Sequence, residues 1–187
     1  MKIGINKICV LLNLLFITAF VSQTSIAQTN NSTPNKDLYK DFKTEFMWDA
    51  KVKIANTIVL GDSKHGTRRV IPITGGTFNG PKIKGEVLPG GDDWQLVRPD
   101  GDTELNARYL LKTDDGIVIQ VINKVLIHMP SKEEKTQPYI KSVIDLEAPT
   151  NSPYAYLNHA IFLGTLEVPV IKKGEEPYVI IGVYKVL

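Results

Sequence analysis

The chain of 187 residues has little of what most familiar metal and catalytic sites require. Its single cysteine, Cys9, lies in the first ten residues, and His65, His128 and His159 are too scattered to share a metal ion. A structural zinc site draws on several closely spaced Cys or His ligands, so none is expected. Neither a Gly-x-Ser-x-Gly nor a His-Glu-x-x-His motif is present. We therefore expect no metal and no cofactor.

A surplus of positive charge is also missing. The chain has 22 Lys and Arg against 20 Asp and Glu, and two of the basic residues, Lys2 and Lys7, precede an apolar run at residues 8–22. Small side chains at Ser25 and Ala27 follow, a pattern typical of a secretory signal peptide. Cleavage after Ala27 would leave a formal net charge of zero, which disfavours nucleic acid as a partner.

The same segment bears on localisation and on domain boundaries. The apolar run is shorter than the roughly 20 residues that a membrane-spanning helix needs, so we expect no stable membrane insertion after cleavage. The predicted destination is the periplasm or the medium. Residues 28–39 are polar and predict a disordered spacer, and residues 40–187 predict one domain.

Apolar residues from position 46 onward recur with a period of two, which indicates half-buried strands. The first such run comprises Phe46, Trp48, Ala50, Val52 and Ile54. Similar runs follow roughly every ten residues, separated by Gly, Asp, Asn and Pro turn formers. This spacing predicts an all-β fold, a single antiparallel β-barrel. One short helix is predicted near residues 153–161, with Pro153 in its first position.

One predicted hairpin, residues 104–125, decides which side chains share a face. Asp115-Gly116 suits a two-residue type I′ turn, and pairing Asp114 with Ile117 then places Arg108 opposite Asn123. Each face of this hairpin would mix apolar and polar side chains. An ordinary sandwich has one wet and one dry face, so mixed faces favour a closed barrel with a partly polar pocket.

Three of the candidate ligand-binding residues, Arg108, Asn106 and Asn123, share one face in this register, and the two aromatic candidates are added for their residue type. The five candidates are Arg108, Asn106, Asn123, Trp94 and Tyr109. Trp94 and Tyr109 are also residue types that fill barrel cores. An exposed cross-strand pair of Arg108 with Asn123 is the alternative without a site.

A carboxylate near an arginine in an apolar barrel mouth could act as a general base. The candidate catalytic residues are Asp93 and Glu86. Asp93 comes shortly after a Gly-Gly pair, and an Asx turn is the favoured interpretation of this residue.

The segment from Arg68 to Lys124 resembles the signature region of uncharacterised protein family 0311, also called domain of unknown function 3237. The matching motifs are Arg-x-Ile-Pro-Ile-x-Gly-Gly-x-Phe-x-Gly-Pro, Leu-Pro-Gly-Gly-x-Asp-Trp, Ala-Arg-Tyr and Asp-Asp-Gly. The resemblance implies a compact antiparallel β-barrel and brings no established activity. The chain departs from the family at Asn123-Lys124-Val125, where Asn-x-Gly is usual. It also has Lys141 where an arginine is usual, and lysine lacks the fork geometry of a guanidinium.

Three functions remain open on the sequence alone. The first is an exported barrel that binds a small polar or anionic organic molecule through Arg108, Asn106 and Asn123. The second is a cofactor-free lyase, isomerase or hydrolase that uses Asp93 or Glu86. The third is a cell-envelope interaction module without a pocket. The sequence leaves both catalysis and homo-oligomerisation undecided.

Overall fold

The structure is a computed structural model that describes residues 43–131, 133 and 135–187. The predicted signal peptide and the whole of the predicted spacer lie outside these residues. Within the described part of the chain, no helix is long and apolar enough to cross a membrane.

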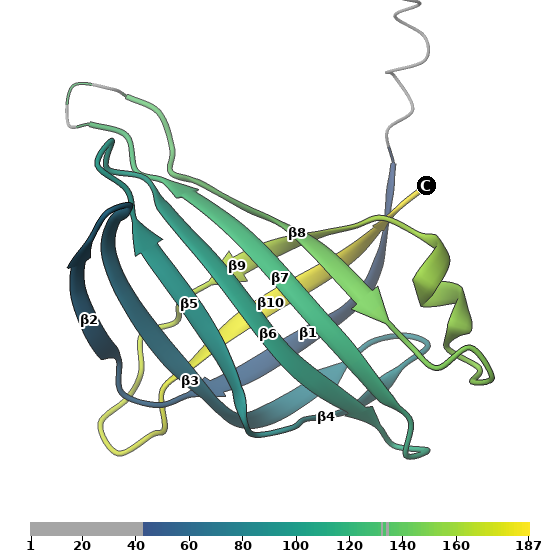
Figure 1. Cartoon of the computed structure of the whole chain (residues 1–187). Helices are drawn as coiled ribbons and strands as arrows, with labels where there is room; N and C mark the ends of the chain where they lie inside the picture. The colour runs from purple at the N-terminus through teal and green to yellow at the C-terminus, as the bar shows by residue number, and fades with distance from the viewer. Residues whose placement is uncertain (1–42, 132, 134) are drawn as a thin grey trace, which may run out of the picture. The chain divides into compact units, whose positions relative to one another are not determined.

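The described residues form strands and one short helix (Figure 1). The first five strands are β1 (Thr44–Ile54), β2 (Ile58–Ser63), β3 (Gly66–Asn79), β4 (Lys84–Val87) and β5 (Gly91–Val97). The other five are β6 (Thr103–Thr113), β7 (Val118–His128), β8 (Tyr139–Glu147), β9 (Phe162–Glu167) and β10 (Tyr178–Val186). The predicted helix is a 3-10 helix, η2 (Ala155–His159), between β8 and β9.

These strands pair into one closed antiparallel barrel, as predicted. Their order is β1-β10-β9-β8-β7-β6, and β6 then pairs with both β5 and β4. The same two short strands pair with β3, and β3 pairs with β1 to close the ring. Because β4 and β5 share one position, the barrel has eight positions around its axis. Strand β2 lies against β3 beside this ring.

The seam between β1 and β3 depends on a glycine. Gly76 lies opposite Val52, and a Cβ atom added to Gly76 would stand 2.0 Å from the carbonyl oxygen of Lys51. Gly76 also has a φ of +140°, which other residues rarely adopt. A side chain at this position would therefore push the two closing strands apart.

One half of the barrel interior is filled by large apolar side chains. Trp48 and Phe78 pack edge to face with ring centroids 5.9 Å apart. Leu111 and Ile119 are fully buried with them, and Leu157 of η2 adds a further fully buried side chain to the same cluster. Alternation along each strand sends these residues inward, as the period of two indicates.

The hairpin between β6 and β7 differs from the predicted one by a single residue. The N–H of Thr113 donates to the carbonyl of Ile117, so Asp114, Asp115 and Gly116 form a three-residue loop. Gly116 takes a φ of +90°, as the last residue of such a loop requires. The predicted two-residue turn is therefore wrong. A shift of one residue moves every side chain to the opposite face.

Candidate functional site

The other half of the barrel interior contains a cavity of about 280 Å³. Its wall is formed by inward-facing residues of β1, β3, β5, β6, β7, β9 and β10, most of them aliphatic. Five lining residues have polar groups: Arg69, Asp93, Gln95, Tyr109 and Asn123. An apolar cavity with a few convergent polar groups is the usual form of a small-molecule site.

Three of the polar residues form a chain of hydrogen bonds. Arg69 of β3 lies opposite Gln95 of β5, and its Nε donates to Gln95 Oε1 at 2.6 Å. Gln95 Nε2 then donates to Oδ2 of Asp93 at 2.6 Å. A guanidinium can only donate, so Arg69 fixes the Gln95 amide with its oxygen toward Arg69 and its nitrogen toward Asp93. The Asp93 carboxylate is thereby held by a single oxygen.

The second oxygen of Asp93 is available for another group. Asp93 Oδ1 is buried and has no hydrogen-bond partner among the described residues. Burial raises the pKa of Asp93 above its usual value of 3.8, and the hydrogen bond from Gln95 opposes that rise in part. Such a carboxyl group exchanges its proton more readily near neutral pH than a solvated one does.

Tyr109 and Asn123 supply further polar groups at the wall. Tyr109 is 4% exposed, and burial raises the pKa of its phenol, which keeps the hydroxyl protonated at neutral pH. Asn123 is 2% exposed, and its Oδ1 has no hydrogen-bond partner among the described residues. The cavity thus contains one phenol and two unpaired acceptor oxygens.

The structure brings three of the seven candidate residues together. Asp93, Tyr109 and Asn123 all line the cavity, on β5, β6 and β7. Asp93 lies in mid-strand with its side chain inward, so the Asx-turn interpretation of this residue is wrong.

The other four lie on the outside of the barrel. Arg108 is exposed and pairs with Ile122, so its predicted position opposite Asn123 is wrong; Asn123 pairs with Ala107. The cause is the one-residue difference in the hairpin loop. Asn106 points outward for the same reason.

Trp94 and Glu86 are likewise outside the cavity. Trp94 is 49% exposed and pairs with Asn106 across β5 and β6. Glu86 forms an ion pair with Lys112, with Oε1 and Nζ 3.5 Å apart. Neither the Glu86 carboxylate nor the Trp94 indole lines the cavity, so these two residues cannot join Asp93 in one site.

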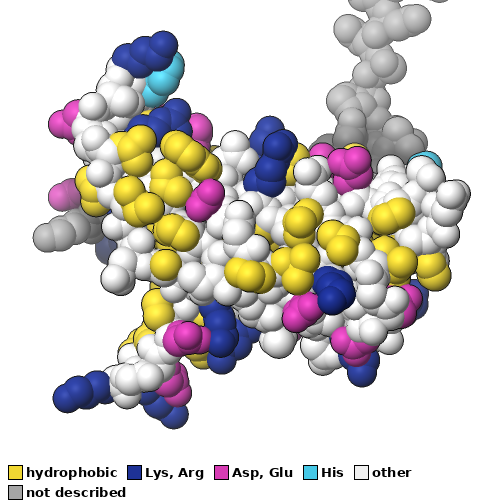
Figure 2. Space-filling model, turned by 60° about the horizontal axis from the view of Figure 1, so that its bottom comes forward, with side chains coloured by type: hydrophobic (Ala, Val, Ile, Leu, Met, Phe, Trp, Pro, Cys, Tyr) yellow, Lys and Arg dark blue, Asp and Glu magenta, His cyan; other side chains and the backbone are white. Residues whose placement is uncertain are grey.

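The face of the molecule in Figure 2 shows no single sign of charge. Figure 2 shows hydrophobic side chains in several groups on one face, with basic and acidic side chains among them. This mixture agrees with the nearly equal numbers of acidic and basic residues in the chain.

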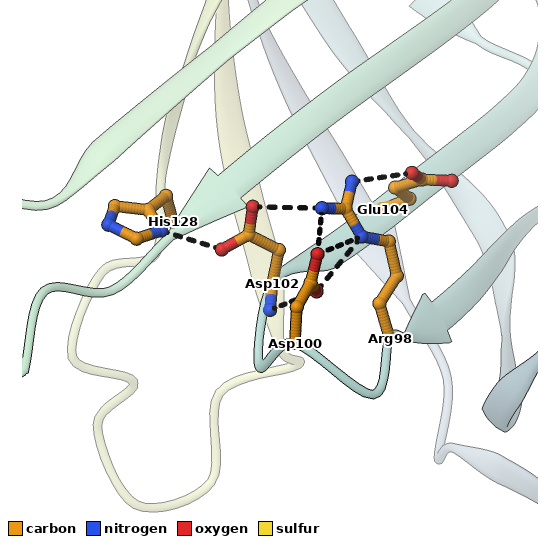
Figure 3. A network of polar contacts seen from close by, with 5 residues as sticks. All are labelled: Arg98, Asp100, Asp102, Glu104 and His128. Carbon is orange, nitrogen blue, oxygen red and sulfur yellow. Dashed lines mark hydrogen bonds and ion pairs between the residues drawn. The ribbon is translucent and has the colours of Figure 1, made fainter.

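A charged network joins the ends of three strands (Figure 3). Arg98 follows β5 and pairs with Asp100, with Asp102 at 3.3 Å and with Glu104 of β6 at 2.9 Å. Asp102 Oδ1 lies 2.6 Å from Nδ1 of His128, at the end of β7. The network holds the turn between β5 and β6 against β7. Along the chain, its residues are close to residues of the same strands that line the cavity.

Sequence reasoning missed Arg69 and Gln95. Both lie at inward positions of alternating strands, Arg69 in Arg-Arg-Val-Ile-Pro-Ile and Gln95 directly after the exposed Trp94. The signal that could have found them is the period of two: a polar residue at an inward position of a strand needs a partner inside the barrel.

Comparison with known proteins gives a family and a fold. The family model described as "Protein of unknown function (DUF3237)" matches residues 42–186. A UPF0311 protein of Rhodopseudomonas palustris is 33% identical over 132 residues, which cover 66% of this chain and 86% of that protein. The crystal structure of a beta-barrel like protein from Acinetobacter baumannii superposes with a TM-score of 0.66 at 32% identity, covering 78% of this chain and 96% of that one.

A more distant relative has a named activity. A protein of Penicillium herquei called hydroalkoxylation enzyme phnH is 26% identical over 121 residues, which cover 65% of this chain and 72% of that protein.

Proposed function

We propose a function for this chain from the premise that it belongs to the DUF3237 family of proteins of unknown function. The chain binds a small, largely apolar organic molecule inside the barrel and exchanges a proton with a hydroxyl group of that molecule through Asp93. The observation that carries this proposal is the buried Oδ1 of Asp93, which faces an apolar cavity without a partner.

The lining of the cavity supports an apolar ligand. Transfer of apolar surface from water into such a cavity contributes about 25 cal/mol for each Å² buried. A fully charged anion would lose its hydration inside the barrel and would meet the Asp93 carboxylate. The arginine of the cavity wall, Arg69, already donates its Nε to Gln95, and Arg108, the cation expected from the sequence, lies outside. We therefore favour a neutral molecule over the anionic one that the sequence suggested.

The polar groups support a hydroxyl on that molecule. Asp93 Oδ1 needs a donor, and Gln95 already satisfies Oδ2. A hydroxyl group can donate to this oxygen and then lose its proton to it, because burial raises the pKa of Asp93 and makes its carboxylate a stronger base than a solvated one. Export to the periplasm or the medium is also part of the proposal, and it rests on residues 1–27 alone.

A catalytic role is the second candidate, and the named activity of the Penicillium herquei relative favours it. Hydroalkoxylation adds the O–H bond of an alcohol across a carbon–carbon double bond. In such a step Asp93 takes the hydroxyl proton, the oxygen bonds to one alkene carbon, and the π electrons move to the other. That carbon then receives the proton back from Asp93, so no oxidant or reductant is consumed.

Binding of 2-naphthol, compared with naphthalene, tests the proposal. We expect the full-length protein to bind 2-naphthol, and Asp93→Asn to weaken this binding about tenfold, because one hydrogen bond to a charged group is worth roughly 1.5 kcal/mol or more. Naphthalene binding should change little. Titration calorimetry measures both.

Asp145→Asn is the matched control, because Asp145 is an exposed carboxylate on the outer face of β8. This variant should bind 2-naphthol like the unmodified chain. Failure of 2-naphthol to bind, or equal binding by the Asp93→Asn variant, would contradict the proposal and favour an interaction module without a pocket.

A further inference from the structure

Asp93, Ala107 and Asn123 lie in one row across three neighbouring strands. Asp93 of β5 pairs with Ala107 of β6, and Ala107 pairs with Asn123 of β7. Residues in one row of a sheet point to the same side, and all three line the cavity. The row therefore places an acid and an amide on either side of the smallest side chain of the cavity wall.

Ala107 leaves a notch between its two neighbours. Adjacent strands are about 4.8 Å apart, so the Cα atoms of Asp93 and Asn123 stand roughly 10 Å apart with only a methyl group between them. The side chains that follow Ala107 in either direction along the inner face are larger, Leu105 and Tyr109. A small polar group of a ligand can thus reach the wall between Asp93 and Asn123.

Both neighbours of the notch present an oxygen that lacks a partner. These atoms are Asp93 Oδ1 and Asn123 Oδ1, and each is buried without a hydrogen bond among the described residues. Buried polar atoms in native proteins are nearly always paired, with protein, water or ligand. Two such atoms at one notch, in an otherwise aliphatic wall, indicate a place built for a polar group.

We infer that Asn123 is a second recognition residue and that the ligand carries two adjacent hydroxyl groups, one donating to Asp93 and one to Asn123. This inference rests on the proposed function. A hydroxyl group has one hydrogen, so two acceptors require two donors, and a catechol or a vicinal diol offers them at neighbouring atoms. The rest of the molecule lies against the aliphatic wall.

Three naphthols of similar size test this inference. 2-Naphthol has one hydroxyl, 2,3-dihydroxynaphthalene has two adjacent ones, and 2,6-dihydroxynaphthalene has two distant ones. We expect the unmodified protein to bind the 2,3-compound about tenfold tighter than 2-naphthol, because it gains one buried hydrogen bond. The 2,6-compound should bind no tighter than 2-naphthol.

Three variants identify the side chains that supply the gain. Asn123→Leu keeps a side chain of similar size without an acceptor, so the affinity of the 2,3-compound relative to that of 2-naphthol should fall from about tenfold to about one. Asn123→Ser retains an acceptor and is the second variant if Asn123→Leu does not fold. Ala107→Leu fills the notch and should weaken binding of every naphthol.

The outcomes separate this inference from the proposed function. If 2-naphthol binds but the 2,3-compound binds no tighter, Asn123 Oδ1 receives no hydrogen bond from the ligand, and the inference is wrong while the proposed function stands. Persistence of the preference in Asn123→Leu would also overturn it. If no naphthol binds the unmodified protein, the proposed function itself fails.

Discussion

At the scale of single residues, Asp93 has one carboxylate oxygen with a hydrogen-bond partner and one without. Its Oδ2 is held by Gln95, while its Oδ1 faces the cavity without a partner. Burying such a group costs folding free energy, because the charged form loses water that the hydrogen bonds from Gln95 and from the Asn106 backbone do not fully replace. Residues of this kind are retained where the free oxygen meets a ligand.

The raised pKa of Asp93 predicts how stability depends on pH. In the unfolded chain Asp93 loses its proton near the usual pKa of 3.8, whereas the folded chain keeps it to a higher pH. As pH rises between these two values the unfolded state is favoured, so the free energy of unfolding falls. The Asp93→Asn variant has no carboxyl group to ionise at this position, so its free energy of unfolding does not fall in this way. It should therefore be more stable than the unmodified chain at pH 7.

Thermal unfolding at pH 7 and near pH 3 measures this effect. The advantage of Asp93→Asn should shrink toward zero at the lower pH, where Asp93 is protonated in both states. Asp145→Asn makes the same chemical change on the outer face and serves as the control. An advantage that is equal at both pH values would show that burial of charge is not its cause.

Gln95 predicts a linked loss of stability and binding. Gln95→Leu leaves Asp93 Oδ2 without the Gln95 amide, which should cost about 1–3 kcal/mol and weaken 2-naphthol binding. Arg69 is exposed, so water can replace the partner that it loses. Gln120→Leu is a matched change on the outer face of β7, where Gln120 donates to Glu147 at 2.9 Å. It should cost no more than about 0.5 kcal/mol. Denaturant titration gives both values, and equal losses would argue against the internal hydrogen-bond chain.

One residue of the candidate site could be predicted from its residue type, whereas two others could be predicted only once the pairing register of the strands is known. Asp93 could be chosen as a candidate from the sequence, because it is an acid directly before an aromatic residue at the start of a predicted strand. Arg69 and Gln95 resemble ordinary surface residues until the strands are aligned, because one arginine or glutamine in a strand has no local signature. Pairing between β3 and β5 alone brings them together.

At the scale of elements, the loop of the β6–β7 hairpin has a defined conformational demand. Gly116 has a φ of +90°, and open space surrounds the position of a Cβ atom, so only backbone strain opposes a side chain. Gly116→Ala should therefore lower the free energy of unfolding by about 1 kcal/mol. Gly116→Asn should cost less, because asparagine tolerates this conformation better.

Chemical denaturation measures both Gly116 variants. Equal losses for alanine and asparagine would contradict the argument from positive φ. A loss for alanine much above 1 kcal/mol would mean that Gly116 contacts something beyond its own loop.

The same loop explains why strands were predicted better than their register. The period of two identifies a strand from its own residues, and the described strands follow runs of that kind except β2, which was not predicted and is mostly exposed. The length of a hairpin loop depends on which of the possible turns has the lower free energy. Asp-Asp-Gly is compatible with both a two-residue and a three-residue loop. One residue of difference placed Arg108 outside the barrel and Asn123 inside it without its predicted partner.

At the scale of the whole molecule, closure of the barrel predicts a large effect of a single methyl group. Gly76→Ala would place a Cβ atom 2.0 Å from the Lys51 carbonyl at the seam between β1 and β3. We expect a loss of about 3 kcal/mol or more, because strain at a special φ and a backbone clash act together. Gly90→Ala is the control, since Gly90 also has positive φ, +101°, but no atom within 4 Å of the added Cβ.

Thermal unfolding of the two glycine variants separates strain from the clash. Gly90→Ala should lose about 1 kcal/mol, as expected from strain alone. Losses of similar size at both positions would mean that β1 and β3 can move apart without breaking the barrel.

The fold was predictable at this scale, whereas the cavity was not. Regular spacing of strands and turns leads to a barrel or a sandwich, and mixed faces favoured the barrel. A cavity arises from the sizes of many side chains that meet from different strands, such as Ala107 of β6 beside Val52 of β1 and Val179 of β10. No short stretch of sequence contains that information.

The order of strands around the barrel has a consequence for synthesis of the chain. Strand β10 lies between β1 and β9, although β1 and β10 are the first and last described strands in the chain. Contacts between distant parts of a chain form slowly, since the connecting loop must close first. A nascent chain that ends before Tyr178 therefore exposes the unpaired edges of β1 and β9 while it is still attached to the ribosome. Chaperones that cover strand edges would act in this interval, and truncation within β10 should send the chain to aggregation rather than to a smaller barrel.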